Sequence, residues 1–140
     1  MRKRVGVVGV CLASLLLLSG CSVALDSYRG LPVDESGQSP DDAADGLLTG
    51  EPIAVWVDPA DLRFAVVLFG SSSCAPYPTS VGAGEDAQEI TVGIGRPPWP
   101  MCTADLAGTT YELRAPDGID PAQDVRVVVD GRTVGLAAAP

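Results

Sequence analysis

Hydrophobic and polar positions divide the chain into three parts. Residues 5–18 form an apolar run, residues 22–50 are mostly polar, and from Glu51 onward short apolar runs alternate with turn residues. As a helix the first run would cover about 21 Å, whereas the hydrocarbon core of a bilayer is about 30 Å thick. The first part is therefore too short to span a membrane.

The third part, residues 51–140, has the pattern of a β domain. Residues 53–57 and 64–69 are apolar at successive positions, which is typical of strands covered on both faces, so we expect them to be the central strands. Residues 90–94 and 110–114 alternate between apolar and polar side chains, which predicts two strands with one face in water.

Two hairpins are predicted in this part. Residues 125–129 and 132–136 flank Asp130-Gly131, a pair that tolerates the positive φ of a type I′ turn, so Val127 should pair with Val134 and Val125 with Leu136. A second hairpin should join residues 79–81 to 88–92. No helical period of ten or more residues follows residue 21. The pattern predicts an all-β domain, a small antiparallel sandwich of six to seven strands.

The start of the chain carries an export signal. Arg2, Lys3 and Arg4 precede the apolar run, which ends in Leu18-Ser19-Gly20-Cys21. This tetrapeptide resembles the lipobox of bacterial lipoproteins. The resemblance implies that residues 1–20 are a signal peptide, that the thiol of Cys21 is diacylated, and that the mature protein is held at the extracytoplasmic face of the cell membrane.

Two other interpretations of the start remain open. The run could be a plain cleaved signal followed by an incidental cysteine, or a short uncleaved signal anchor. Cys11 lies inside the run and should leave with the signal as a small hydrophobic residue. Since acyl chains contribute about 0.8 kcal/mol per buried methylene, only two or more of them give lasting attachment.

The charge balance limits the partners. The whole chain carries a net charge of −9, and without the three basic residues of the signal eighteen acids face six arginines, a net charge of −12. This argues against nucleic acid as a partner and against electrostatic docking to anionic lipid. Residues 22–50 are acidic and poor in apolar residues, so residues 21–50 are predicted to form a lipidated flexible tether with an r.m.s. length of roughly 30 Å.

Several reaction classes are excluded by composition. The chain has no histidine, and its only lysine lies in the signal, so a serine nucleophile would have no usual base and a zinc site would lack ligands. Residues 70–74, Gly-Ser-Ser-Ser-Cys, are accordingly a polar loop. The aspartates at 58, 61, 117, 120 and 124 lack the spacing of a calcium loop and are interpreted as turn formers. We predict no enzyme activity, no cofactor and no metal.

Cys74 and Cys102 are the cysteines that remain after the signal and the acylated Cys21, and in an exported domain they predict a disulfide. Counting strands places both of their loops at one end of the sandwich. The same end should carry Tyr77 and Trp99, each flanked by prolines, as candidate ligand-binding residues. The alternative is that Trp99 plugs the end of the sandwich and covers the disulfide.

Three functions remain after these exclusions. The first is a lipid-anchored extracytoplasmic binding or interaction module, with an envelope protein or a glycan as partner. The alternative is a non-enzymatic structural or accessory lipoprotein of the cell envelope, and the third is a small carboxylate-dependent hydrolase. The overall plan of lipobox, acidic tether and disulfide-bonded β domain is similar to that of uncharacterised lipoproteins from GC-rich Gram-positive bacteria.

Overall fold

The computed structural model describes residues 23–32, 42–98 and 101–139, and these form a β-sandwich with very little helix. The elements of the described part are β1 (Asp26–Arg29), α1 (Asp42–Thr49), β2 (Ile53–Asp58), the 3₁₀ turn η1 (Pro59–Asp61), β3 (Arg63–Gly70), β4 (Tyr77–Ala83), β5 (Glu89–Gly95), β6 (Ala107–Arg114), β7 (Val125–Val129) and β8 (Arg132–Leu136). The predicted all-β sandwich is confirmed. No described helix is long and apolar enough to cross a membrane.

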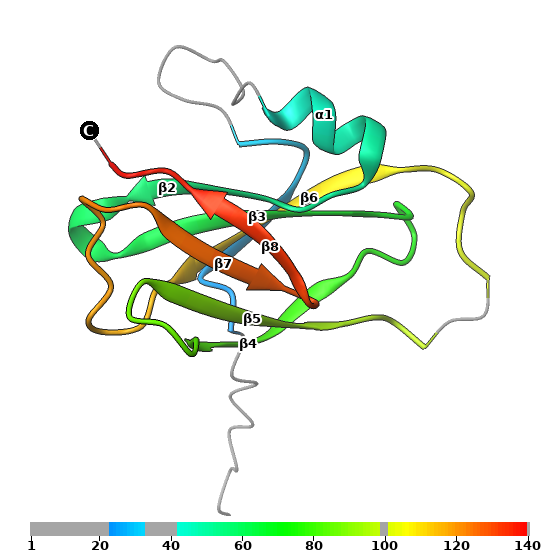
Figure 1. Cartoon of the computed structure of the whole chain (residues 1–140). Helices are drawn as coiled ribbons and strands as arrows, with labels where there is room; N and C mark the ends of the chain where they lie inside the picture. Colours follow the sequence, from blue (N-terminus) through cyan, green and yellow to red (C-terminus); the bar gives the residue numbers. More distant parts are fainter. Residues whose placement is uncertain (1–22, 33–41, 99–100, 140) are drawn as a thin grey trace, which may run out of the picture.

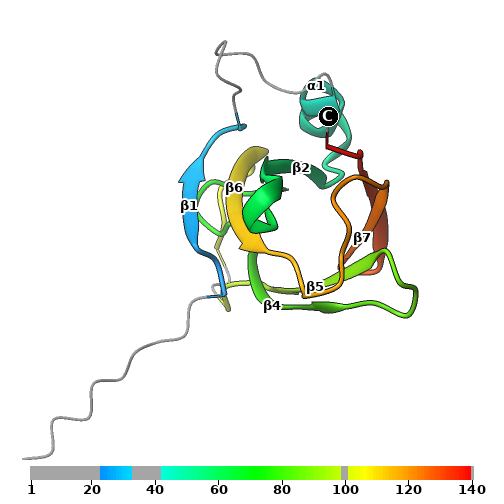
Figure 2. The same cartoon turned by 90° about the vertical axis from the view of Figure 1, so that its left-hand side faces the viewer.

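The strands form two four-stranded sheets that face each other (Figures 1 and 2). The first sheet has the order β1-β6-β3-β2 and is antiparallel throughout, and the second has the order β4-β5-β7-β8. In the second sheet β5 and β7 are parallel, so the prediction of a purely antiparallel sandwich is wrong for this pair. The reason is that β6, between them in sequence, belongs to the other sheet, and the chain returns in its original direction.

The main core lies between the sheets and is built from alternate residues of the strands. Its fully buried side chains include Phe64, Val66, Ile90, Val92, Leu113, Val125, Val127, Val129 and Leu136. Burial of such side chains contributes about 1.5–3 kcal/mol each relative to exposure. Trp56 packs its ring edge-on against Phe64 at a centroid distance of 6.3 Å. The alternation predicted for residues 90–94 is confirmed, since Ile90 and Val92 are buried and Thr91 is exposed.

A second, smaller cluster covers the outer face of the first sheet. Val67 and Ile53 are buried there together with Leu31 and Phe69. α1 lies over this face, and at Gly46 a Cβ atom would come within 2.6 Å of the Phe69 ring (Figure 1). Residues 64–69 are apolar at successive positions because β3 is covered on both faces, as predicted. β2 also has this covering, but it is an edge strand, so the prediction that it is central is wrong.

The segment predicted as a tether, residues 21–50, belongs largely to the fold where it is described. β1 pairs with β6, with Ser27 opposite Tyr111, and the backbone N–H groups of Leu25 and Gly30 donate to Glu112 and Gly108 at 2.8 and 2.9 Å. The tether prediction is therefore wrong for residues 23–32 and 42–50. It failed because β1 is held by backbone hydrogen bonds, while its four side chains are exposed.

Because β1 covers β6, the prediction that one face of residues 110–114 lies in water is wrong at Thr110. Thr110 was expected to face water, but its side chain is completely buried and its hydroxyl donates to the Gly30 carbonyl at 2.7 Å. A buried hydroxyl needs such a partner because leaving it unpaired is costly. Residues 25–30 thus cover the edge of β6 and also supply a hydrogen-bond acceptor, the Gly30 carbonyl, for Thr110.

Both predicted hairpins are confirmed. β4 pairs with β5, with Val81 opposite Val92, and β7 pairs with β8, with Val127 opposite Val134 and Val125 opposite Leu136. Asp130 and Gly131 have φ values of 51° and 77°, as a type I′ turn requires.

We predict that Gly131→Ala lowers the free energy of unfolding by about 1 kcal/mol, because a residue with a Cβ atom is disfavoured at positive φ. No atom lies within 4 Å of the position that this Cβ would take, so the effect isolates the backbone conformation. Gly135→Ala is the matched control, since Gly135 has equal space without a positive φ. Urea denaturation of the two variants checks this, and equal stability would contradict it.

We also predict that Thr110→Val lowers the free energy of unfolding by about 1 kcal/mol, since valine keeps the shape but removes the hydrogen bond to Gly30. Thr91→Val, at an exposed position of β5, should have little effect. Thermal denaturation of both variants measures the difference. A neutral Thr110→Val would indicate that residues 23–32 do not cover β6 in solution.

Candidate functional site

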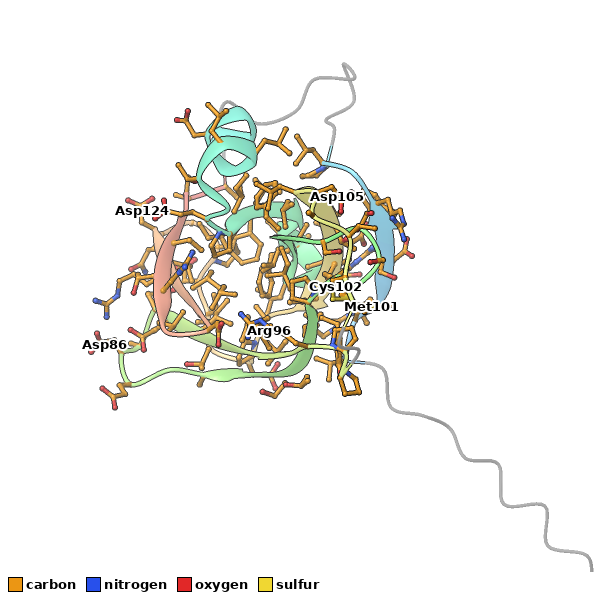
Figure 3. All side chains as sticks on the ribbon, turned by 90° about the vertical axis from the view of Figure 1, so that its right-hand side faces the viewer. Asp86, Arg96, Met101, Cys102, Asp105 and Asp124 are labelled. Atoms are coloured by element: carbon orange, nitrogen blue, oxygen red, sulfur yellow. A yellow bond between two sulfur atoms is a disulfide. The ribbon has the colours of Figure 1, made fainter. Side chains whose placement is uncertain are left out.

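The disulfide end of the sandwich gathers most of the polar groups that could recognise a partner. Cys74, in the loop between β3 and β4, is bonded to Cys102, in the loop between β5 and β6, with their Cα atoms 5.6 Å apart. Figure 3 views this end of the molecule and labels Cys102. The predicted disulfide is confirmed, and so is the prediction that both loops meet at one end.

A network of hydroxyl groups surrounds the disulfide. The Thr103 Oγ1 atom lies 2.8 Å from the hydroxyl of Ser71 and 3.2 Å from those of Ser72 and Ser73. The Thr103 backbone N–H donates to Ser73 Oγ at 2.9 Å, and Asp105 accepts from the Ser72 N–H at 3.1 Å and from the Thr103 hydroxyl. These groups are exposed, so the network joins the two loops while remaining open to a partner.

Asp105 is the charged member of this network. Hydrogen bonds from the Ser72 side chain, the Thr103 hydroxyl and the Ser72 backbone N–H lower the pKa of Asp105 from 3.8 to about 2. A carboxylate with so low a pKa is ionised at neutral pH and is a weak base. It can accept hydrogen bonds from a ligand, but it is poorly suited to activate a neighbouring serine hydroxyl.

A small hollow is lined by residues at the ends of β3 and β5 and in the β7–β8 turn. Its volume is about 150 Å³, its apolar lining includes Phe69 and Ile94, and its charged lining consists of Arg96, Asp130 and Arg132. The Arg96 guanidinium contacts the Asp130 carboxylate at 2.7 Å, which joins the end of β5 to the β7–β8 turn. Small-molecule sites usually enclose about 300–1,000 Å³, so this hollow suits a protruding group of a larger partner.

Tyr77 borders a second hollow, separate from the one that Arg96 lines. This second hollow, of about 400 Å³, is bordered by Tyr77, Pro78 and Tyr111 and by the first described residues, Val23 and Ala24. The Tyr77 side chain is 42% exposed, and its ring lies over Gly95, where a Cβ atom would come within 2.8 Å of it. The structure thus brings Tyr77 close to the beginning of the domain.

Tyr111 forms the inner wall of this second hollow. Its hydroxyl donates to the Pro76 carbonyl at 2.9 Å, and burial raises the pKa of the Tyr111 phenol. This hydrogen bond ties β6 to the loop that follows Cys74. Tyr111 is therefore fixed in place, whereas the Tyr77 ring has a free face toward solvent.

Two of the predicted site residues, Cys21 and Trp99, lie outside the described residues. The pairing of Trp99 with Tyr77 and the acylation of Cys21 thus stay predictions. Sequence reasoning did not single out Thr103 and Asp105. Their position next to Cys102, with Ser71, Ser72 and Ser73 next to Cys74, was the signal that could have identified them, because a disulfide brings the neighbours of both cysteines together.

Of the aspartates considered for calcium, Asp58 and Asp120 accept hydrogen bonds within their own turns, and Asp124 accepts one from the last described segment. Asp58 accepts from the Asp61 backbone N–H at 3.3 Å, Asp120 accepts from the Ala122 N–H at 3.0 Å, and Asp124 accepts from the Ala138 N–H. In the part of the chain that the structure describes, no three His, Cys, Asp or Glu side chains gather as a metal ion would need.

Comparison with protein-family models, with curated proteins and with solved structures found no significant match for this chain.

We predict that Asp105→Asn lowers the melting temperature at pH 7 and that the difference from the unchanged protein disappears as the pH falls. The pKa of Asp105 is lower in the folded state, so its ionised form stabilises the fold above about pH 4, and this contribution is lost as the pH falls through about 2. Melting curves between pH 7 and pH 2 measure the difference. A difference that stays constant over this range would contradict the role of the carboxylate charge.

Proposed function

We propose that the protein is a lipid-anchored, extracytoplasmic interaction module that is held at the cell membrane through Cys21 and contacts an envelope protein or a glycan with its disulfide end. The anchor is supported by the order of basic, apolar and Leu18-Ser19-Gly20-Cys21 segments. An extracytoplasmic location is supported by the Cys74–Cys102 bond, since disulfides persist mainly in oxidising compartments.

The observation that carries the interaction role is the network that joins Ser71, Ser72 and Ser73 to Thr103 and Asp105. These groups offer hydroxyls, a fixed carboxylate and backbone groups on two loops that the disulfide holds together. Closing a loop of this length stabilises the fold by roughly 3.6 kcal/mol in the chain-entropy model. Loops fixed before binding lose little conformational entropy when a partner arrives.

The charges nearby indicate what kind of partner fits. Arg96 and Arg132 are two of the six arginines outside the signal, and both border the small hollow at the ends of β3 and β5. Together with Asp130 they give this hollow a lining of mixed charge beside the apolar Phe69 and Ile94. Hydrogen-bonding groups of a sugar or of a polypeptide suit such a surface, and it has no row of cations to hold a nucleic acid.

The anchor is tested by expressing the full chain in a bacterium and analysing the membrane fraction by mass spectrometry. We expect a mature protein that begins at Cys21 and carries acyl chains. Cys21→Ser should abolish both cleavage and acylation, whereas the matched variant Cys11→Ser should behave like the unchanged protein. A membrane-bound chain that still begins at Met1, or a free thiol at residue 21, would contradict the anchor.

The interaction role is tested by a photo-crosslinking amino acid placed at Ser72 or Asp105 in intact cells. Asp61 and Glu85, exposed in the turns at the other end of the strands, are the control positions. We expect discrete adducts from the first two positions and not from the controls. Equal labelling at both ends, or no adduct at either, would favour a structural or accessory envelope protein.

A further inference from the structure

We propose that the side of the sandwich where the described chain begins docks directly on the lipid headgroups, so that the domain sits on the membrane in one orientation. We call this side the anchor face and define it by Val23, Ala24, Ser27, Tyr77, Pro78 and Tyr111, which border one hollow of about 400 Å³. The inference rests on the proposed acylation of Cys21. It adds which side of the domain the acylated end brings to the membrane.

The proposed anchor at Cys21 lies only a short distance from the first folded residues. Val23 and Ala24 pack against the main core, and the next residue, Leu25, donates its backbone N–H to Glu112 of β6 at 2.8 Å. The chain is thus fixed from Val23 onward. Cys21 precedes Val23 by two residues, a separation of at most about 7 Å between Cα atoms. A tether of roughly 30 Å, as the sequence predicts, is replaced by a connection too short to lift the domain off the lipid.

The first described residues, Val23 and Ala24, lie on one side of the sandwich. Figures 1 and 2 both place the beginning of the described chain beside β4, on the side where β1 and β4 are the edge strands. β2 and β8 are the edges of the opposite side. A lipid attached two residues before Val23 therefore brings the β1 and β4 edges to the membrane and leaves the β2 and β8 edges turned away from it.

The anchor face has the chemistry of a surface that can lie against lipid headgroups. Its side chains are aliphatic, hydroxyl-bearing or aromatic, and the lining includes no charged group. Glu112, next to Tyr111 in sequence, points to the other face of the sheet and is paired with Arg63. In a chain with eighteen acids and six arginines after the signal, this neutral lining adds no repulsion from an anionic headgroup layer, and the exposed Asp26 and Arg29 of β1 carry opposite charges.

Tyr77 is the residue of the anchor face that is placed to enter the headgroup layer. Its side chain is 42% exposed, and its ring packs against Gly95. Tyrosine is enriched at membrane–water interfaces because its ring is apolar and its hydroxyl remains hydrated. The anchor face thus assigns Tyr77 to lipid, in place of the ligand role expected from the sequence.

The test uses the acylated protein obtained by expressing the full chain. It is purified from membranes and reconstituted in nanodiscs of phosphatidylcholine that contain a small share of a gadolinium-chelating lipid. Amide NMR spectra then report which residues lie close to the headgroups. We expect the amide signals of Ala24, Ser27 and Tyr77 to be lost by paramagnetic broadening. The signals of Val55 in β2 and Gly135 in β8, on the opposite side, should persist.

The control is a chain with a Gly-Ser linker of about ten residues inserted between Ser22 and Val23, which adds roughly 16–19 Å of reach. We expect the inserted linker to abolish the difference between the two sides. In the chain without the insertion, equal broadening of Tyr77 and Gly135 overturns the docking while leaving the anchor intact. A residue 21 without acyl chains, seen by mass spectrometry of the same sample, overturns both proposals.

Discussion

The pairing of residues 25–30 with β6 is the constraint on which the position of the domain relative to residue 21 depends. The bonds from Leu25 to Glu112 and from Gly30 to Gly108 extend the first sheet by one strand, and the Thr110 hydroxyl adds a buried hydrogen bond to Gly30. Without this pairing, residues 22–50 would be a linker and the orientation of the sandwich would be arbitrary. With it, residues 26–29 become an edge strand of the first sheet.

The disulfide end and the anchor face differ in their chemistry. The disulfide end carries the hydroxyls, Asp105 and the Arg96–Asp130 pair, all suited to a polar partner. The anchor face carries Tyr77, Tyr111 and small aliphatic side chains, which suit an interface between water and lipid. The Tyr111 hydroxyl, bonded to Pro76 in the loop that follows Cys74, connects the two regions physically.

The parts of the fold that depend on local patterns could be predicted from the sequence. Asp130-Gly131 predicted the last hairpin and its register, and Cys74 and Cys102, the two cysteines outside the predicted signal and its acylation site, predicted the disulfide. The covering of the outer face could not be predicted, because β1 has exposed side chains and is held mainly by backbone pairing, and because the contact of α1 depends on the small size of Gly46. Within the candidate site, the meeting of the two cysteine-bearing loops at one end could be predicted. The neighbours of Tyr77 could not be predicted, because they depend on which strands form the edges of the two sheets.

Amide hydrogen exchange at Leu25 and Gly30 in the purified domain, residues 22–140, shows whether this segment belongs to the sheet or is a linker. Backbone N–H groups that are bonded within a sheet exchange only when that sheet opens, whereas those of a linker exchange at the rates of an unfolded peptide. We predict that Leu25 and Gly30 are protected, with protection approaching that of the β6 amides they neighbour. Exchange of both amides at unfolded rates, with β6 still protected, would contradict it.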